Sequence, residues 1–489
     1  MKFILKLHPE ITIKSDSVRR RFTRILESNI RNLFKPYEFK VALWNRWDKL
    51  ILEAKTTSRS EIEQVLDQLK RIPGIEQCLQ VQQSEYHSLD DIYQQVKAVW
   101  GDKLADKRFA VKVRRRGKHD FTSMDVARYV GGGLNQHCDS AGVDLTNPQV
   151  LIELEVDKDQ LLIINNRFKC LGGMPLPTQE DVISLISGGF DSGVSSYQMI
   201  RRGARTHYCF FNLGGKEHEI AVKQVACYLW QRFGASHRVK FISVNFEPVV
   251  EQILERTDNG LMGVVLKRLM LKAASIVADN LAVSTLVTGE AMGQVSSQTL
   301  SNLAVIDRAT DKLVLRPLIC MDKAEIINLA REIGTEDLSK SIPEYCGVIS
   351  NRPTVKADLG QIEQQQTLID EGLIESLVQA AYVEDIRRIV REATEEVREV
   401  ETTQSLPDKA VVLDIRSAEE QERAPLRVEG KEVKHLPFYR LASQFPNLDQ
   451  NRQYYLFCDR GVMSRMQALL LHENGYTDVK VFRPKTVRH

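Results

Sequence analysis

The chain has 489 residues, of which 43% are hydrophobic and 27% are charged, so it has room for about three domains of ordinary globular composition. Its formal net charge of +2 excludes a uniformly basic chain, so any contact with nucleic acid requires a local basic patch. No apolar run approaches the roughly 20 residues that span a bilayer. Eight cysteines without a close CxxC pair argue against a disulfide framework or a zinc site. These features predict a cytoplasmic protein with reduced thiols and no membrane contact.

Up to about residue 165, short strand patterns alternate with helical patterns. Residues 40–44 predict a strand, and residues 60–69 predict a helix with Ser60 as its N-cap. Residues 171–177 are rich in glycine and proline, which predicts a linker to the rest of the chain.

A basic run covers residues 107–119, with the sequence KRFAVKVRRRGKH. Alternation places Val111 and Val113 on one face of the predicted strand and Lys112 on the other. Such a run can neutralise phosphates and bind nucleic acid without reading its sequence, or it can be a solvated charged surface.

The residues after this run resemble the THUMP domain of RNA-modifying enzymes. The resemblance rests on residues 121–133, FTSMDVARYVGGG, and on Asn147-Pro148 ahead of a predicted strand at 150–156. It implies that this region holds the acceptor end of a tRNA. The preceding residues resemble the ferredoxin-like domain that accompanies THUMP.

From Asp181 onward the pattern repeats an apolar strand, a turn and a helix, which predicts a doubly wound parallel sheet covered by helices. The predicted strands are 182–186, 207–211, 239–244 and 285–288, and the predicted helices include 217–233 and 264–278.

The turn after the first of these strands has the sequence Ser187-Gly188-Gly189-Phe190-Asp191-Ser192. Its glycines allow the backbone to approach an anion closely, and the hydroxyls and free N–H groups of a helix start can bind phosphate. The turn resembles that of the PP-loop ATP pyrophosphatases, which split ATP between the α- and β-phosphates. The resemblance implies that Asp191 helps to hold Mg²⁺ and that Lys323 stabilises the transferring phosphate. It implies ATP contacts at Leu185, Ile186, Ser187, Gly188, Gly189, Asp191, Ser192, Lys267, Gly289 and Gln298.

The charged stretch 382–401 predicts a helix that connects to a last small α/β unit. In that unit a strand at 454–457 ends at Cys458, in a loop before a predicted helix at 465–474. The N–H groups and positive dipole end of such a helix, together with Arg460, favour a thiolate or persulfide.

This loop resembles the active-site loop of the rhodanese domain, which carries sulfur on its cysteine. Met463 stands where many rhodaneses have arginine, which fits the branch fused to a PP-loop domain. A second cysteine, Cys346, lies between Pro343 and Gly347; by itself it would be inert, but it matches a PEYCG motif with a catalytic cysteine.

The order of these parts resembles that of the bacterial tRNA sulfurtransferases that make 4-thiouridine. The resemblance implies that a cysteine desulfurase loads sulfur onto Cys458, and that ATP with Mg²⁺ adenylates uridine 8 of tRNA. It also implies a transient Cys346–Cys458 disulfide that an external reductant resets, sulfur supply to the sulfur-carrier protein of thiamine thiazole synthesis, and a homodimer. The expected α/β parts are a ferredoxin-like domain at 1–60, THUMP at 61–165, a PP-loop domain at 175–395 and a rhodanese domain at 404–489.

Two other classes fit parts of the sequence. One is an ATP-dependent ligase or amidotransferase that acts on a small molecule, and it would leave the THUMP-like region and Cys458 without a purpose. The other is a non-catalytic RNA-binding protein, and the intact SGGFDS turn and both thiols argue against it.

Overall fold

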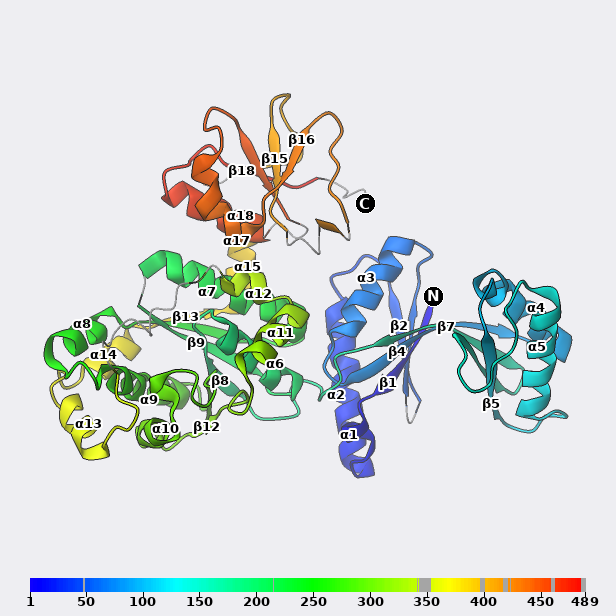
Figure 1. Cartoon of the computed structure of the whole chain (residues 1–489), viewed down its shortest axis with the longest axis horizontal. Coiled ribbons are helices and arrows are strands. Elements are labelled where there is room, and N and C mark those ends of the chain that lie inside the picture. The colour runs from blue at the N-terminus through cyan, green and yellow to red at the C-terminus, as the bar shows by residue number, and fades with distance from the viewer. Residues whose placement is uncertain are drawn as a thin grey trace. The chain divides into compact units, whose positions relative to one another are not determined.

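The computed structural model describes residues 1–46, 49–213, 215–340, 342, 353–395, 401–416, 421–422, 424–458 and 462–484. The chain forms two compact units, Met1–Thr178 and Gln179–His489 (Figure 1). Within the described ranges, every helix is too short or too polar to cross a membrane.

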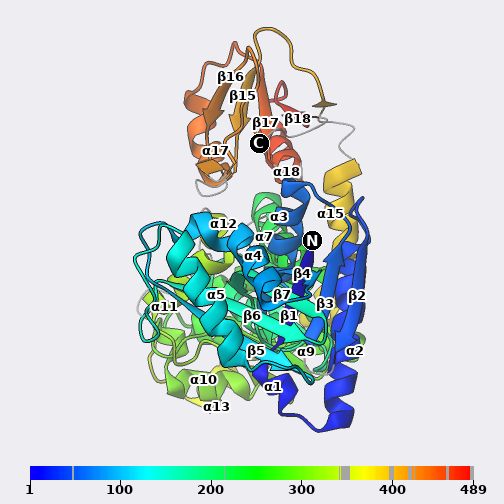
Figure 2. The same cartoon turned by 90° about the vertical axis from the view of Figure 1, so that its right-hand side faces the viewer.

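The first unit is built on one seven-stranded sheet with the order β2-β3-β1-β4-β7-β6-β5 (Figure 2). Only β5 and β6 pair in parallel. The strands are β1 (Lys2–Leu7), β2 (Val41–Arg46), β3 (Lys49–Ala54), β4 (Ile75–Glu85), β5 (Phe109–Arg116), β6 (Val150–Asp157) and β7 (Gln160–Lys169). The ferredoxin-like and THUMP-like regions therefore share a sheet, joined along β4 and β7.

The long helices of this unit pack on one face of the sheet. One core joins α2 and α3 to residues such as Phe3 and Leu5 of β1, and a second joins α4 and α5 to β5, β6 and β7. Ile4 and Lys6 alternate with Phe3 and Leu5, so they lie on the opposite face. The helices are α1 (Pro9–Thr12), α2 (Asp16–Phe34), α3 (Arg59–Lys70), α4 (Leu89–Trp100) and α5 (Ser123–His137).

One expectation for this unit needs correction. Ser60 is not an N-cap, because α3 begins at Arg59 and the extended residue before it is Ser58, whose carbonyl accepts the Ile62 N–H at 3.0 Å. The predicted linker at 171–177 directly precedes the boundary between the two units, and it packs onto the first of them, because Met174 is buried and Gly172 O accepts a hydrogen bond from Gly74 N at 2.7 Å.

The second unit contains a six-stranded sheet with the order β12-β11-β8-β9-β10-β13. Its first five strands are parallel, and helices cover both faces, as predicted: Phe211 packs toward α9, whereas the adjacent Phe210 contacts His218 of α7. The strands are β8 (Val182–Leu185), β9 (Thr206–Asn212), β10 (Lys240–Asn245), β11 (Thr285–Val287), β12 (Leu313–Leu315) and β13 (Tyr382–Asp385). The helices include α6 (Phe190–Arg201), α7 (Gly215–Leu229), α8 (Glu247–Arg256), α9 (Met262–Asn280), α10 (Leu300–Asp307), α11 (Lys323–Ile333), α12 (Glu336–Lys340), α13 (Leu359–Gln366) and α14 (Leu373–Gln379).

The predicted connector helix at 382–401 begins later than expected, so its predicted start is wrong. Tyr382–Asp385 forms the antiparallel edge strand β13, and helix α15 (Ile386–Glu395) begins only after it. The charged residues are compatible with a strand because an edge exposes half of its side chains, while Glu384 is buried and pairs with Lys223 at 3.0 Å.

The chain ends in a smaller five-stranded sheet with the order β14-β18-β17-β15-β16, in which all pairings are parallel. Cys458 follows β17 directly and lies four residues before α18. The elements are β14 (Thr402–Thr403), β15 (Val411–Asp414), β16 (Glu432–His435), α17 (Phe438–Gln444), β17 (Tyr454–Phe457), α18 (Val462–Glu473) and β18 (Lys480–Phe482).

Candidate functional site

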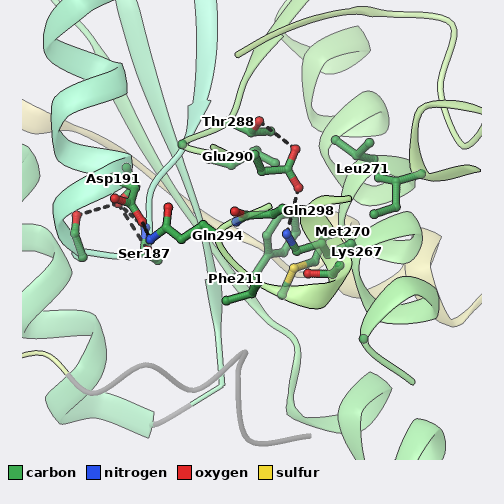
Figure 3. A pocket seen from close by; sticks show the side chains of 18 of the residues that line it. Ser187, Asp191, Phe211, Lys267, Met270, Leu271, Thr288, Glu290, Gln294 and Gln298 are labelled. Atoms are coloured by element: carbon green, nitrogen blue, oxygen red, sulfur yellow. Dashed lines mark hydrogen bonds and ion pairs between the residues drawn. The ribbon is translucent and has the colours of Figure 1, made fainter. Parts of the chain in front are cut away.

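A cavity of about 660 Å³ opens in the second unit at the carboxyl ends of the central strands (Figure 3). Open parallel sheets bind ligands at this edge, and the volume is that of a small-molecule site. Of the ten residues expected to contact ATP, all but Gly188 line the cavity: Leu185, Ile186, Ser187, Gly189, Asp191, Ser192, Lys267, Gly289 and Gln298.

The turn between β8 and α6 is held by its own serines. Ser192 Oγ lies 3.2 Å from both the N–H and the Oγ of Ser187, and it donates to Gly189 O at 3.1 Å. Gly188 has a φ of +82°, and a Cβ there would lie 2.4 Å from Ile342. The turn is therefore pre-formed, and the positive end of α6 lies at the cavity, a position that favours anions.

Gly289 brings the end of β11 against the start of α6. A Cβ at this position would lie 2.6 Å from the carbonyl carbon of Asp191 and 2.7 Å from Ser192 N, closer than any side chain permits. Glycine is therefore required for the two phosphate-facing segments to meet.

Asp191 forms an ion pair with Lys323, the first residue of α11. Lys323 Nζ lies 2.9 and 3.0 Å from the two carboxylate oxygens, and Gln294 Nε2 donates to Oδ2 at 3.1 Å. The sequence suggested separate roles for Asp191 and Lys323 but did not predict that they pair. Gln294 lines the cavity and was not predicted as a site residue.

A second charged group lies at the carboxyl ends of β11 and β12, and of its members only Lys267 was among the predicted site residues. Glu290 accepts a hydrogen bond from Lys267 Nζ at 2.8 Å and one from Arg316 Nε at 2.8 Å. Burial alone would raise the pKa of Glu290, but the charges of Lys267 and Arg316 hold it below its ordinary value. The position of Glu290 directly after Gly289 was the signal in the sequence that could have identified it.

The remaining wall of the cavity is largely apolar and suits a flat base. Phe211, Met270 and Leu271 contribute to it, and their labelled side chains appear in Figure 3. His218, also not predicted, lines the cavity with its Nε2 3.4 Å from Ser187 O, and burial lowers its pKa. His218 therefore contacts the backbone of the turn.

The surroundings of Cys458 contain hydrogen-bond donors and positive charge. Ser464 is fully buried, and both its N–H and its Oγ lie 3.3 Å from Cys458 Sγ. Burial and the nearby Arg483 lower the pKa of Arg465, while Cys458 acts in the opposite direction. Cys346 and Arg460 lie outside the described residues.

The helix-free face of the first unit's sheet carries a basic hollow of about 290 Å³. Its charged lining residues come from five strands: Lys6, Lys49, Lys112, Arg114, Arg116, Glu153, Glu155 and Arg167. Arg167 pairs with Glu153, and Lys49 and Arg116 share Glu155 at 3.3 and 3.2 Å.

Three cations of this hollow, Lys6, Lys112 and Arg114, form no ion pair within the described ranges, although the charge of Glu153 acts on Lys6. Burial, followed by the charges of Arg167 and Arg114, lowers the pKa of Lys6. The hollow therefore has an excess of positive charge that an anionic ligand would neutralise.

Family models match three parts of the chain. The ThiI ferredoxin-like domain matches residues 2–78, the THUMP domain matches 86–165, and the model described as thiamine biosynthesis protein (ThiI) matches 177–370.

Similar proteins cover the chain almost end to end. A tRNA sulfurtransferase of Shewanella piezotolerans is 57% identical over 484 residues, which is 99% of this chain and 100% of the relative. One of Yersinia pestis is 57% identical over 485 residues, with the same coverage. Among solved structures, a 4-thiouridine synthetase–RNA complex with bound ATP has a TM-score of 0.68 at 24% identity, covering 78% of this chain and 99% of that one. A Pyrococcus horikoshii protein has a TM-score of 0.52 at 17% identity, covering 68% and 100%.

Proposed function

Because the chain belongs to the tRNA sulfurtransferase family, we propose that it uses ATP to activate uridine 8 of tRNA and replaces O4 with sulfur carried by Cys458. The product is 4-thiouridine. The observation that carries the proposal is the cavity itself, which gathers the SGGFDS turn, Lys267, Gly289 and Gln298 at one edge of a parallel sheet.

ATP would place its phosphates against the start of α6, where backbone N–H groups and the hydroxyls of Ser187 and Ser192 face the cavity. The residues present fit Mg²⁺ only in part, because the described residues contain no group of three or more His, Cys, Asp or Glu side chains that could hold a metal ion. Asp191 would therefore hold the ion together with the phosphates of ATP. When bound, Mg²⁺ neutralises phosphate charge. Lys323, beside Asp191, supplies a second positive charge for the transferring phosphate.

The reaction has two parts. Uridine O4 attacks the α-phosphorus, the bond to the β-phosphate breaks, and pyrophosphate leaves. Sulfur then bonds to C4, delivered by the Cys458 persulfide directly or as released sulfide, and AMP leaves with the former O4. The Cys346 thiolate attacks Sγ of Cys458, before or after the outer sulfur has bonded to C4, and breaks the S–S bond to that sulfur, which leaves as sulfide or as the sulfur of 4-thiouridine. An external dithiol then supplies two electrons to reduce the resulting Cys346–Cys458 disulfide. The role of Cys346 rests on family resemblance alone.

The tRNA would bind at the basic hollow of the first unit. Phosphate contacts position an RNA without reading its sequence, and the uncovered sheet face presents Lys6, Lys112 and Arg114 toward the same space. Side chains of the basic run at 107–119 alternate between the two faces of β5. Lys112 and Arg114 therefore face the hollow, and Arg115 lies on the opposite face.

Further parts of the proposal rest on family membership. They are a cysteine desulfurase as sulfur donor, the sulfur-carrier protein of thiamine thiazole synthesis as a second acceptor, and a homodimer. The Thiamine biosynthesis protein (ThiI) model that matches residues 177–370 supports the second acceptor.

The decisive test is mass spectrometry of nucleosides from unmodified tRNA incubated with the protein, ATP, Mg²⁺, cysteine and a desulfurase. We expect 4-thiouridine, lost without ATP and lost in Cys458→Ala. A persulfide on Cys458 without 4-thiouridine would instead indicate a carrier for another acceptor. Consumption of ATP without tRNA, with a small molecule as acceptor, would indicate a ligase.

A further inference from the structure

We propose that Glu290 is a positioning residue that holds the ammonium group of Lys267 at the cavity wall, with Arg316 holding Glu290 in turn. This inference rests on the proposed binding of ATP in the cavity. Nothing in the motif that contains Glu290 assigns the carboxylate a role.

Hydrogen bonds to both oxygens fix the orientation of the Glu290 carboxylate. Oε1 accepts from Lys267 Nζ at 2.8 Å, while Oε2 accepts from Arg316 Nε at 2.8 Å and from Thr288 Oγ1 at 3.0 Å. Figure 3 shows the Glu290 carboxylate between Thr288 and Lys267. Three elements thus meet at one carboxylate: α9 through Lys267, the end of β11 through Thr288, and the end of β12 through Arg316.

Only one of the two cations faces the ligand space. Lys267 lines the cavity, whereas Arg316 does not and instead forks onto Asp307 with contacts of 3.1 and 2.5 Å. Arg316 therefore holds Glu290 from outside the cavity, and Glu290 in turn holds the Lys267 ammonium group at the cavity wall.

Lys267 needs such an anchor because a lysine ammonium sits on a flexible four-carbon stem. An ammonium has three N–H donors, and the bond to Glu290 uses one of them. The other two remain for phosphate or ribose oxygens in the cavity.

The test compares ATP binding and turnover in Glu290→Gln and in Asp307→Asn. The glutamine keeps the shape of Glu290 but removes its charge, and the second change removes an acid from Arg316 without touching Lys267. We expect Glu290→Gln to raise KM for ATP about tenfold with little change in kcat. Asp307→Asn should resemble the wild type in both respects.

A double-mutant cycle separates positioning from general damage. If Glu290 acts through Lys267, Lys267→Met/Glu290→Gln should bind ATP no worse than Lys267→Met alone. Additive losses, or a KM for ATP that Glu290→Gln leaves unchanged, would overturn the proposal. Should Glu290→Gln fail to fold by circular dichroism, Glu290→Asp replaces it, since it keeps the charge but shortens the reach and should still raise KM. Failure of the wild type to bind ATP would reject the proposed function and this inference with it, whereas normal ATP binding by both the wild type and Glu290→Gln would overturn the inference alone.

Discussion

Lys323 and Asp191 lie 132 residues apart in the chain, yet Lys323 Nζ is 2.9 Å from Asp191 Oδ1. The pair joins the first turn of α6 to the first turn of α11 and places both signs of charge beside the phosphate-binding turn. The Lys323 side chain is 39% exposed, so it can exchange the carboxylate for a phosphate oxygen without crossing the core.

Replacing Lys323 by alanine should remove the positive charge nearest the transferring phosphate. Pyrophosphate release in the presence of tRNA should fall by about 100-fold or more, whereas persulfide formation on Cys458 by a desulfurase should remain. Lys312→Ala is the matched control, because this lysine pairs with Asp279 on the surface. Equal pyrophosphate release in both variants would contradict the assigned role of Lys323.

A methyl group at Gly289 should separate β11 from α6. Gly289→Ala forces a Cβ to within 2.6 Å of the Asp191 backbone, so the phosphate-binding turn must shift and ATP binding should be lost. Isothermal titration with ATP and Mg²⁺ measures this. Gly193→Ala, in the same helix, meets only ordinary contacts from 3.7 Å and should bind ATP normally. Unchanged binding in Gly289→Ala would show that the turn tolerates displacement.

The hydroxyl of Ser464 should stabilise the thiolate of Cys458. Ser464→Ala removes one donor, so the pKa of the Cys458 thiol should rise and its alkylation by iodoacetamide should become slower at neutral pH. Quantifying the Cys458 peptide by mass spectrometry at several pH values gives the midpoint.

The buried cysteines provide the internal comparison for that experiment. Burial raises the pKa of Cys209 and of Cys227 to about 12, so both should stay unmodified in the folded protein. If the pH midpoint of Cys458 alkylation is the same in Ser464→Ala as in the wild type, the backbone N–H and Arg465, rather than the Ser464 hydroxyl, stabilise the thiolate.

The two faces of β5 should contribute unequally to tRNA binding. Lys112→Ala/Arg114→Ala removes two cations from the hollow, so affinity should fall and the slope of log K against log salt should decrease by about 1.5 to 2. Arg115→Ala, on the opposite face, should leave the slope nearly unchanged. Filter binding of unmodified tRNA across a salt series measures both. Equal changes of the salt slope in the two variants would show that tRNA does not bind preferentially at the face of β5 that lines the hollow.

Local chemistry in the sequence was enough to identify much of this protein. The SGGFDS turn, the strand-to-helix alternation of the second unit and the strand-end position of Cys458 were all predicted, because each depends on neighbouring residues. Glycine conformations, hydrophobic periodicity and helix-start donors act over a few positions of the chain.

Tertiary structure decided the features that depend on distant partners. Tyr382–Asp385 forms a strand because it pairs with the edge strand β10, and this pairing outweighs the charge pattern that predicted a helix. The Lys323–Asp191 pair and the Glu290 carboxylate between Lys267 and Arg316 exist only because the fold brings several strand ends and helix starts together. Charges interact through space rather than along the chain, so a sequence can supply the charged residues, but only the folded structure can pair them.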